Sequence, residues 1–537
     1  MWRHSSACPS RPYATPSSVD VTAAKLKPYS RYKDSGVEWL GAVPAHWEVR
    51  RLRTIAEMRV SSVDKHSREG ERPVRLCNYV DVYKAGRIRT GMRLMVATAA
   101  SEEIEKFRLR AGDVLITKDS EAWNDIGVPA LVEGATDDTI CGYHLALLRP
   151  LSDCVSGGFL FRAAQSSAVA YQFHVRANGV TRYGLTHNGI KSAWFSVPPP
   201  AEQAAIVRFL DHIDRRIRRY IRAKEKLIAL LEEQKQASIH EAVTGRIDVR
   251  TERPYSSYKN AGVEWLAEMP EHWEAIRFSR LIGEGPKNGI SPRAVEDGTV
   301  RSFAISAIRD GVVDVHEADV KMVALDPGIR RGVYGLVADD ILLVRGNGNL
   351  RLVGRAGLVD RAMEEWVYPD LLMRVRLTRT ALPRFVVAVL NSGVVRSQIE
   401  AVAHTAVGTF KVNGEDVRGL WLPVPHLDEQ RHISQYIKER LAALAMAAEV
   451  ARRGIQLVTD YRTRLFADVV TGKLDVRDVA AGLPEIDPLA MDDKLDGVNA
   501  TGDGSDSEGE IIGSDREDCG TPARDRRDDP EEPDGRA

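Results

Sequence analysis

Two long stretches of the chain place apolar residues at alternating spacings of four and three. The first starts after Glu202 and meets no Pro or Gly before Gly245, and its apolar positions are Ile206, Leu210, Ile213, Ile217, Tyr220, Leu227 and Leu231. The second is carried by Ile437, Leu441, Leu444, Ala448, Ala451, Ile455, Val458, Leu465 and Val469. This spacing predicts two helices, each on the order of 60 Å long. An isolated helix cannot bury such a seam, so we expect the two to pair in antiparallel directions; two separate core helices are the alternative.

The chain on either side of the first helix has a different pattern. Residues 74–150 and 300–376 contain short runs rich in Val, Ile and Leu between turn residues, such as Asp113–Thr117 and Ile341–Val344. Runs of this length and composition are typical of β-strands. Each stretch therefore predicts a mixed α/β globule.

Three landmarks occur twice at nearly constant spacing. Residues 32–48 recur at 258–274 with an offset of 226, Glu202-Gln203 recur as Glu429-Gln430 with an offset of 227, and 243–250 recur at 470–477 with an offset of 227. A fixed period indicates tandem copies of one structural unit, here of roughly 220 residues. We expect an α+β protein with pseudo-two-fold tandem symmetry: two mixed α/β globules separated by two long helices that form an antiparallel coiled coil.

The charges are segregated along the chain. Between Asp478 and Ala537 there are 19 acidic and 6 basic side chains, whereas residues 1–477 carry an excess of twelve positive charges. A basic surface suits a polyanionic partner. The acidic tail and the Ser/Pro-rich start have too few apolar residues to fold and are predicted to be disordered. Without a run of ~18 apolar residues or a secretion signal, we expect a cytoplasmic protein with no membrane contact.

Motifs for catalysis are missing from the sequence. It has no Gly-x₄-Gly-Lys-Ser/Thr loop, no Asn/Asp-Pro-Pro-Tyr/Phe methylation motif and no Gly-x-Gly-x-x-Gly fingerprint. The five cysteines lack the spacing of a metal knuckle and are interpreted as reduced thiols: Cys8, Cys77, Cys141, Cys154 and Cys519. We therefore expect no catalytic residues, no metal and no cofactor on this chain.

The repeated landmarks carry a resemblance to a known family. Tyr-Lys-Asp-Ser-Gly-Val-Glu-Trp-Leu with Pro-x-His-Trp-Glu, the helix entry Pro-Pro-x-x-Glu-Gln, and the helix exit Val-Thr-Gly-Arg/Lys-Ile/Leu-Asp resemble the specificity subunit of type I restriction-modification systems from about residue 30 to 477. The resemblance implies a non-catalytic subunit whose two target-recognition domains each read half of a split site in double-stranded DNA.

The resemblance also implies partners and a division into domains. The coiled coil would dock two modification subunits per chain, which use S-adenosylmethionine, and restriction subunits, which use ATP and magnesium. The expected segments are a disordered extension (1–29), target-recognition domain 1 (30–200), a central helical region (201–250), target-recognition domain 2 (251–425), a C-terminal helical region (426–477) and an acidic disordered tail (478–537).

Candidate DNA-binding residues are the cationic and amide side chains of the divergent globules. Arg can bind guanine, and Asn adenine, through two hydrogen bonds, and neighbouring glycines allow the backbone to approach closely. The candidates are Lys84, Arg87, Arg89, Lys118, Asn178, Thr181, Arg182 and Tyr183 in the first globule and Arg345, Asn347, Asn349, Arg351, Thr409 and Lys411 in the second.

Residues of the repeated landmarks are predicted to be structural. Trp39, Trp47, Trp265 and Trp273 should pack against a globule or helix, His46 and His272 should be satisfied polar groups, and the two Glu-Gln pairs should cap their helices.

Two other functions remain open from the residues alone. One is an enzyme with an unrecognised DNA-modifying or DNA-cleaving centre, which would show activity by itself. The other is a coiled-coil scaffold that does not bind DNA, which salt-dependent DNA affinity of the assembled complex would exclude.

Overall fold

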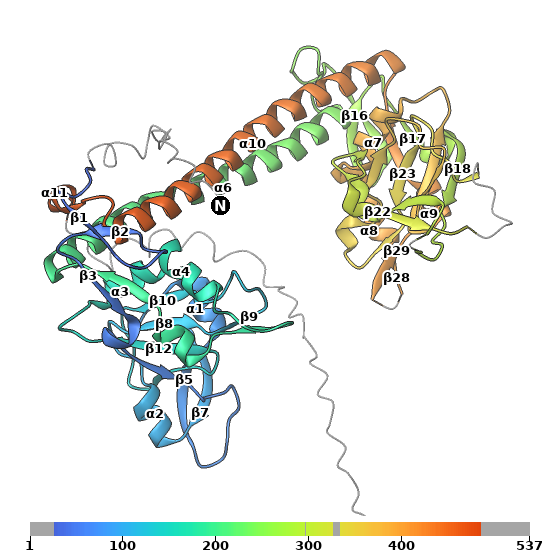
Figure 1. Cartoon of the computed structure of the whole chain (residues 1–537). Coiled ribbons are helices and arrows are strands. Elements are labelled where there is room, and N and C mark those ends of the chain that lie inside the picture. Colours follow the sequence, from blue (N-terminus) through green and yellow to red (C-terminus); the bar gives the residue numbers. More distant parts are fainter. Residues whose placement is uncertain (1–25, 296, 326–332, 407, 485–537) are drawn as a thin grey trace, which may run out of the picture. The chain divides into compact units, whose positions relative to one another are not determined.

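The computed structural model describes residues 26–295, 297–325, 333–406 and 408–484 (Figure 1). Disorder was predicted for 1–29 and 478–537, and of these residues 1–25 and 485–537 lie outside the described ranges. Both predicted disordered segments extend too far into the folded chain. Tyr29 is buried and its ring packs edge-on against Trp47, with ring centroids 5.6 Å apart. At the other end, Ala480 is buried in the core of the first globule, within a short helix, α11 (Arg477–Ala481).

Two helices of 44 residues each carry the predicted seams: α6 (Pro200–Val243) and α10 (Leu427–Val470). Proline stands at the first position of α6, where its missing N–H costs nothing. Both helices end before a glycine with positive φ, at Gly245 and Gly472. A Cβ on Gly245 would come within 2.4 Å of the Pro270 ring, so both the backbone angle and the close approach require glycine.

The two helices lie side by side and run in opposite directions (Figure 1). Asp214 near the start of α6 contacts Arg462 near the end of α10, at 2.7 Å. At the opposite ends, Ile239 of α6 shares a core with Ile433 and Ile437 of α10. The helices are therefore packed together at both ends of the pair.

The first globule is built on a five-stranded sheet. Its strand order is β4 (Ala56–Val60), β12 (Leu145–Pro150), β8 (Val114–Thr117), β10 (Pro129–Val132) and β6 (Arg87–Ile88). All four residues of β8 are buried, as expected for a central strand. A smaller sheet has the order β11 (Thr139–Cys141), β5 (Arg72–Cys77) and β7 (Met95–Ala99). The remaining elements are β1 (Tyr32–Asp34), β2 (Ala42–Pro44), β3 (Glu48–Arg51), β9 (Asp119–Ser120), β13 (Tyr183–Gly184), β14 (Trp194–Val197), α1 (Tyr79–Ala85), α2 (Ser101–Phe107), α3 (Gly157–Ala164), α4 (Ser167–His174) and α5 (His187–Lys191).

The second globule has a six-stranded sheet. Its strand order is β18 (Ile282–Asn288), β27 (Leu372–Leu377), β23 (Ile341–Val344), β25 (Ala356–Leu358), β21 (Val312–Val313) and β20 (Ile308–Arg309). Two three-stranded sheets accompany it, in the orders β22 (Val320–Val323), β19 (Val300–Phe303), β26 (Trp366–Val367) and β24 (Gly346–Asn347), β29 (Thr409–Lys411), β28 (His404–Ala406). Further elements are β15 (Tyr258–Val263), β16 (Leu266–Pro270), β17 (Glu274–Arg277), β30 (Trp421–Val424), α7 (Pro383–Leu390), α8 (Gly393–Val402) and α9 (Gly414–Gly419).

Each globule shares one hydrophobic core with one end of the helix pair. In the first, Phe159 and Phe195 pack with Ile213 of α6 and Leu465 of α10. In the second, Phe385 packs with residues from the end of α6 and the start of α10. The mixed α/β character predicted for each globule is confirmed, and each globule is held on both helices.

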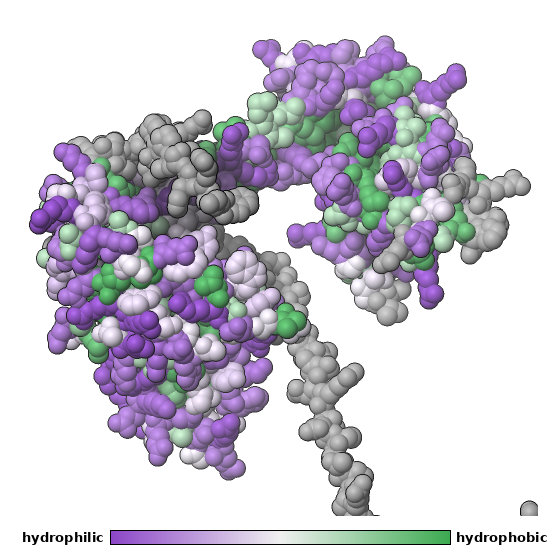
Figure 2. Space-filling view, in the orientation of Figure 1, coloured by the Kyte–Doolittle hydropathy of each residue, from purple (hydrophilic) through white to green (hydrophobic). Residues whose placement is uncertain are grey.

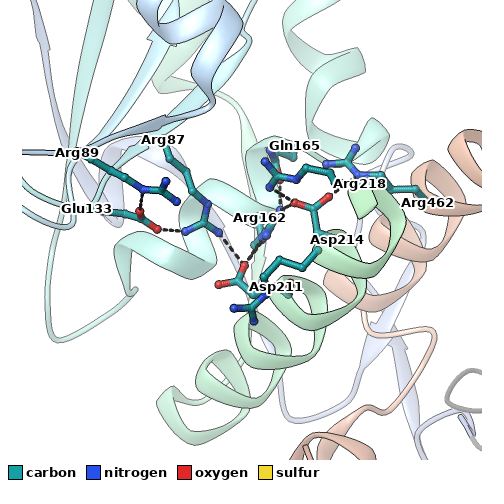
Figure 3. A network of polar contacts seen from close by, with 10 residues as sticks. Arg87, Arg89, Glu133, Arg162, Gln165, Asp211, Asp214, Arg218 and Arg462 are labelled. Atoms are coloured by element: carbon teal, nitrogen blue, oxygen red, sulfur yellow. Dashed lines mark hydrogen bonds and ion pairs between the residues drawn. The ribbon is translucent and has the colours of Figure 1, made fainter. Parts of the chain in front are cut away.

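A network of charges reinforces the first of these joints (Figure 3). Arg162 of α3 is almost completely buried and contacts both Asp211 and Asp214 of α6. Asp214 is also bonded to Arg218 and Arg462. Burial acts to raise the pKa of Asp214, but the surrounding arginines outweigh it and hold that pKa far below its usual range. The network therefore ties α3, α6 and α10 together.

The repeated landmarks form similar contacts at both helix starts, except that the buried Trp273 Nε1 makes no hydrogen bond within the described residues. The Glu202 carboxylate accepts a hydrogen bond from the Trp47 indole at 2.9 Å and lies 2.7 Å from His46 Nε2. Glu429 lies 2.8 Å from His272. The Gln203 amide bonds the carbonyl oxygens of Cys154 and Pro198. Both glutamates lie in the first turns of their helices, where a cap was predicted, and the side chains of the pairs also fasten the helices to the globules.

The four landmark tryptophans behave differently from one another. Trp47 and Trp273 are fully buried, as predicted. Trp39 and Trp265 are 41% and 38% exposed, because each follows the first strand of a small surface hairpin. Packing was therefore correctly predicted only for the second tryptophan of each copy.

Among the described residues, no single helix is long and apolar enough to cross a membrane. The helices α7 and α8 have the required length and apolar composition only when they are counted together, and their axes are bent by 62° at the break between them.

Candidate nucleic-acid interface

In the first globule, a loop and a strand end bring together most of the predicted residues. Strand β9 directly follows Lys118 and pairs with β13, which contains Tyr183. The loop is closed by paired backbone hydrogen bonds between Asn178 and Gly184, at 3.1 and 2.8 Å. Asn178, Thr181 and Arg182 are exposed on it. Sequence positions some sixty residues apart thus form one polar surface.

The turn of this loop requires a glycine. Gly179 has φ +150°, and a Cβ at this position would lie only 1.9 Å from the carbonyl oxygen of Arg182. The backbone is therefore folded back tightly on itself, which projects the tip outward. Val180 at the tip is 92% exposed.

Charged and aromatic groups that sequence reasoning missed complete this surface. Asp119 Oδ2 accepts a hydrogen bond from Lys118 Nζ at 2.6 Å and lies 2.8 Å from His144 Nδ1. Arg182 Nη2 lies 3.3 Å from His144 Nε2. The exposed ring of Tyr143 lies under the Lys118 ammonium, 4.9 Å from it. An exposed aromatic ring beside cations is a surface suited to nucleic-acid bases and phosphates.

The balance of charge in this cluster depends on Asp119. Partial burial acts to raise its pKa, but the hydrogen bonds from Lys118 and His144 prevail, so the pKa of Asp119 is lowered. The carboxylate is therefore ionised at neutral pH and holds Lys118 and His144 in place.

The second globule builds its surface at the corresponding place. Arg345 follows the buried strand β23 as Lys118 follows β8. Strand β24 then pairs with β29, with Gly346 opposite Lys411 and Asn347 opposite Phe410. The predicted residues Arg345, Asn347, Thr409 and Lys411 are thereby brought together.

The two asparagines of this loop have a structural task of their own. The side-chain oxygen of Asn347 accepts the backbone N–H of Asn349, and that of Asn349 accepts the N–H of Arg351, both at 2.9 Å. Each amide keeps a second oxygen lone pair and its NH₂ group available, but these bonds hold the side chain against its own turn. Arg345 and Lys411 are therefore the stronger candidates here.

Four predicted residues lie apart from these surfaces. Arg87 and Arg89 contact Glu133, and Arg87 also contacts Asp211 of α6 at 2.9 Å (Figure 3). These ion pairs give both arginines a structural role, and their contact with DNA stays a prediction. Lys84 is exposed at the end of α1, and Arg351 lines a cavity beside the helix pair.

No metal site is formed by the part of the chain that the structure describes: nowhere do three or more His, Cys, Asp or Glu side chains gather suitably. Burial raises the pKa of the Cys77 and Cys141 thiols, which disfavours the reactive thiolate.

Comparisons with known proteins relate the chain to one family. Residues 44–228 match the family model of the type I restriction modification DNA specificity domain. The chain is 25% identical over 342 residues to the Escherichia coli K12 type I restriction enzyme EcoKI specificity subunit, covering 62% of this chain and 68% of that one. It is 21% identical over 449 residues to a Methanocaldococcus jannaschii protein proposed to be the type I restriction enzyme MjaX specificity subunit, covering 82% and 96% of the two chains.

A solved structure shares the fold. It comes from work on complex assembly and conformational transition of the type I R-M system and aligns with a TM-score of 0.60 at 16% identity, covering 80% of this chain and 98% of that chain.

Proposed function

We propose, because the chain belongs to the specificity subunits of type I restriction-modification systems, that each of its globules reads one half of a split DNA site. The chain would select the sequence and leave the chemistry to its partners. S-adenosylmethionine, ATP and magnesium would then be bound by those partners.

One observation carries this proposal. In both globules a cation directly follows a buried central strand: Lys118 follows β8 and Arg345 follows β23. Beside each cation lies a pair of short strands, β9 with β13 in the first globule and β24 with β29 in the second. The position is the same, but the side chains around it differ. Equivalent surfaces with unlike side chains suit two unlike half-sites.

The helix pair would set the distance between the half-sites. At ~1.5 Å per residue, 44 residues span about 66 Å, close to two turns of B-DNA. We propose that α6 and α10 form an antiparallel coiled coil descended from a duplicated unit. Half-sites separated by several unread base pairs follow from this geometry.

The helices also offer a surface for partner subunits. Met446, Val450 and Leu457 are 71%, 66% and 52% exposed and follow one another along the outer side of α10. Leu227 and Leu230 of α6 are exposed as well, and hydrophobic surface is visible on the helix pair in Figure 2. Exposed apolar patches of this kind mark protein interfaces. We assign this stretch to the modification subunits, two per chain, with restriction subunits joining through them.

Exchange of one globule tests the proposal. The chain, assembled with its modification subunit, should methylate a two-part site, and replacing residues 50–195 by those of a relative should change only one part. Sequencing of methylated positions in the host genome gives both parts at once. A replacement that altered both parts, or DNA modification by the chain without partners, would contradict the proposal.

A further inference from the structure

A cavity of about 480 Å³ opens where the second globule meets the helix pair. It is lined by Lys235 and Ile239 of α6, Lys438 and Leu441 of α10, and Arg384 and Ala388 of α7. This volume falls within the range of small-molecule sites in proteins. It is far too narrow for duplex DNA.

The corresponding place in the first globule is filled. Helices α3 and α7 have the same length with an offset of 226, and Glu202 and Glu429 relate α6 to α10 with an offset of 227. Arg162 of the first joint therefore corresponds to Ala388 of the second. The large guanidinium that occupies the first joint is replaced by a methyl group, and this leaves space.

The same comparison explains why the cavity is positively charged. Asp211 and Asp214, which neutralise the arginines of the first joint, correspond to Lys438 and Leu441. Lys235 of the second joint corresponds to Arg462 and keeps its positive charge. Arg162 and Arg218 are replaced by Ala388 and Ala445, whereas Asp211 is replaced by Lys438. The second joint therefore has the cations Lys235 and Lys438 and neither of the two acids.

Few of these cations are neutralised within the described residues. Lys235 is paired with Asp310 at 2.6 Å and with Glu232 at 3.5 Å, and both acids line the cavity. Of the other cations that line the cavity, four have no side-chain hydrogen bond or ion pair to any described residue: Arg351, Arg355, Arg384 and Lys438. All four are exposed, so water screens their charges, and an anion that entered the cavity could pair with them.

Two buried polar atoms in the lining also lack partners. Arg396 Nη2 and Ser434 Oγ are shielded from solvent and make no hydrogen bond within the described structure. Buried donors without partners are costly, and at functional sites they indicate where a ligand binds. The other side of the cavity is apolar, with Ile239, Val387 and Leu441.

We propose that this cavity binds a small organic phosphate with an apolar ring system, of the chemical class of a nucleoside diphosphate. The arginines and Lys438 would hold the phosphates, and the apolar wall would hold the ring. This site goes beyond DNA recognition and lies on the helix pair, where a ligand would bridge the second globule to both helices.

Titration of the full chain with ADP by isothermal titration calorimetry tests the site. We expect saturable binding of ADP, no detectable binding of adenosine, and at least tenfold weaker binding of inorganic pyrophosphate. Adenosine or pyrophosphate binding as tightly as ADP would overturn the proposed ligand class. Duplex DNA should not displace ADP, and displacement would place ADP on the DNA-binding surface instead.

Two variants locate the binding. Ala388→Arg introduces the arginine of the first joint into the cavity, and Arg384→Ala removes an exposed cation without disturbing the core. Each should weaken ADP binding at least tenfold, whereas Arg452→Glu, on an exposed side of α10 away from the cavity, should leave it unchanged. Unaltered ADP binding by the Arg384→Ala chain would overturn the proposal.

The acidic segment after residue 484 is the competing occupant, because it carries opposite charge to the cavity. If the full chain fails to bind ADP but a chain ending at 484 binds it, the acidic segment competes for the cavity, and the proposal that the full chain binds ADP is wrong. DNA binding by the assembled complex is measured separately, so failure of either proposal leaves the other standing.

Discussion

Asp214 illustrates how much of the first joint depends on one carboxylate. It is fully buried and touches arginines from α3, α6 and α10. A buried charge is tolerated only when it is well paired, so loss of the carboxylate would leave Arg162 buried with one acidic partner fewer. The whole joint should respond to its protonation.

The pKa of Asp214 gives the direction of the pH effect. Because it is lower in the folded than in the unfolded chain, its stabilisation is complete above the unfolded value of about 4 and is lost as the pH falls toward the folded value. We expect Asp214→Asn to destabilise the chain by about 3 kcal/mol at pH 7. The difference from the unaltered chain should shrink on acidification, as measured by urea unfolding from pH 7 to pH 3. Asp153→Asn, at an exposed position, should behave like the unaltered chain throughout.

Arg182 and Arg345 are predicted to act on different half-sites. Arg182→Ala should weaken binding of the assembled complex to its DNA about tenfold, with relaxed preference in one half-site only. Arg345→Ala should do the same for the other half. Affinity measured against duplexes mutated in either half separates the two, with the exposed Arg53→Ala as control. Equal effects of both variants on one half would refute the assignment.

At the residue scale, the sequence predicted polar loops correctly but did not predict which charged residues form ion pairs. The Arg182 loop was predicted because glycine-flanked polar residues are recognisable locally. The role of Arg87 was not, because its partner Asp211 lies 124 residues away. Tyr143 and His144 escaped notice for the same reason, since only folding brings them to Lys118.

At the scale of elements, the long helices were the most predictable feature. Their apolar spacing and flanking prolines and glycines are local signals, and both helices follow them. The seam is nevertheless not buried throughout: Leu227, predicted to lie in it, is 39% exposed. The middle of the pair is therefore incompletely covered, next to the exposed side chains of α10.

Charges introduced on this stretch should block assembly without unfolding the chain. Met446→Glu together with Val450→Glu lies on the solvent side of α10, so we expect an unchanged thermal midpoint but loss of most binding to the modification subunit. Size-exclusion chromatography of the mixed subunits gives the readout. Arg452→Glu alters a different side of α10 and should leave assembly intact, and full assembly of the doubly substituted chain would exclude this docking surface.

At the scale of the whole molecule, the repeat predicted the framework but not the contents of the globules. Strand pairs such as β12 with β4 join residues about ninety positions apart, and spacing alone does not specify such pairing. The landmarks are different, because the same tight contacts around Glu202 and Glu429 require the same residues twice.

Lengthening both helices should lengthen the recognised site. Seven residues inserted after Ala229 and seven after Ala445, at similar levels of the antiparallel pair, preserve the apolar seam and add about 10 Å. At ~3.4 Å per base pair we expect roughly three more unread base pairs between the half-sites. Sequencing of methylated DNA from cells with the altered chain measures this, and an unchanged spacing would show that the helices do not set it.

The unlike joints imply unlike sensitivities of the two arms. The arm fastened by Arg162 and Asp214 depends on paired ions and should loosen first in acid. The other arm lacks those acids. Hydrophobic contacts hold both arms, around Phe159 in the first and Phe385 in the second, so cooling would weaken both whereas acid would weaken only the first. Acid would then loosen the first globule on the helix pair under conditions that leave the second globule attached.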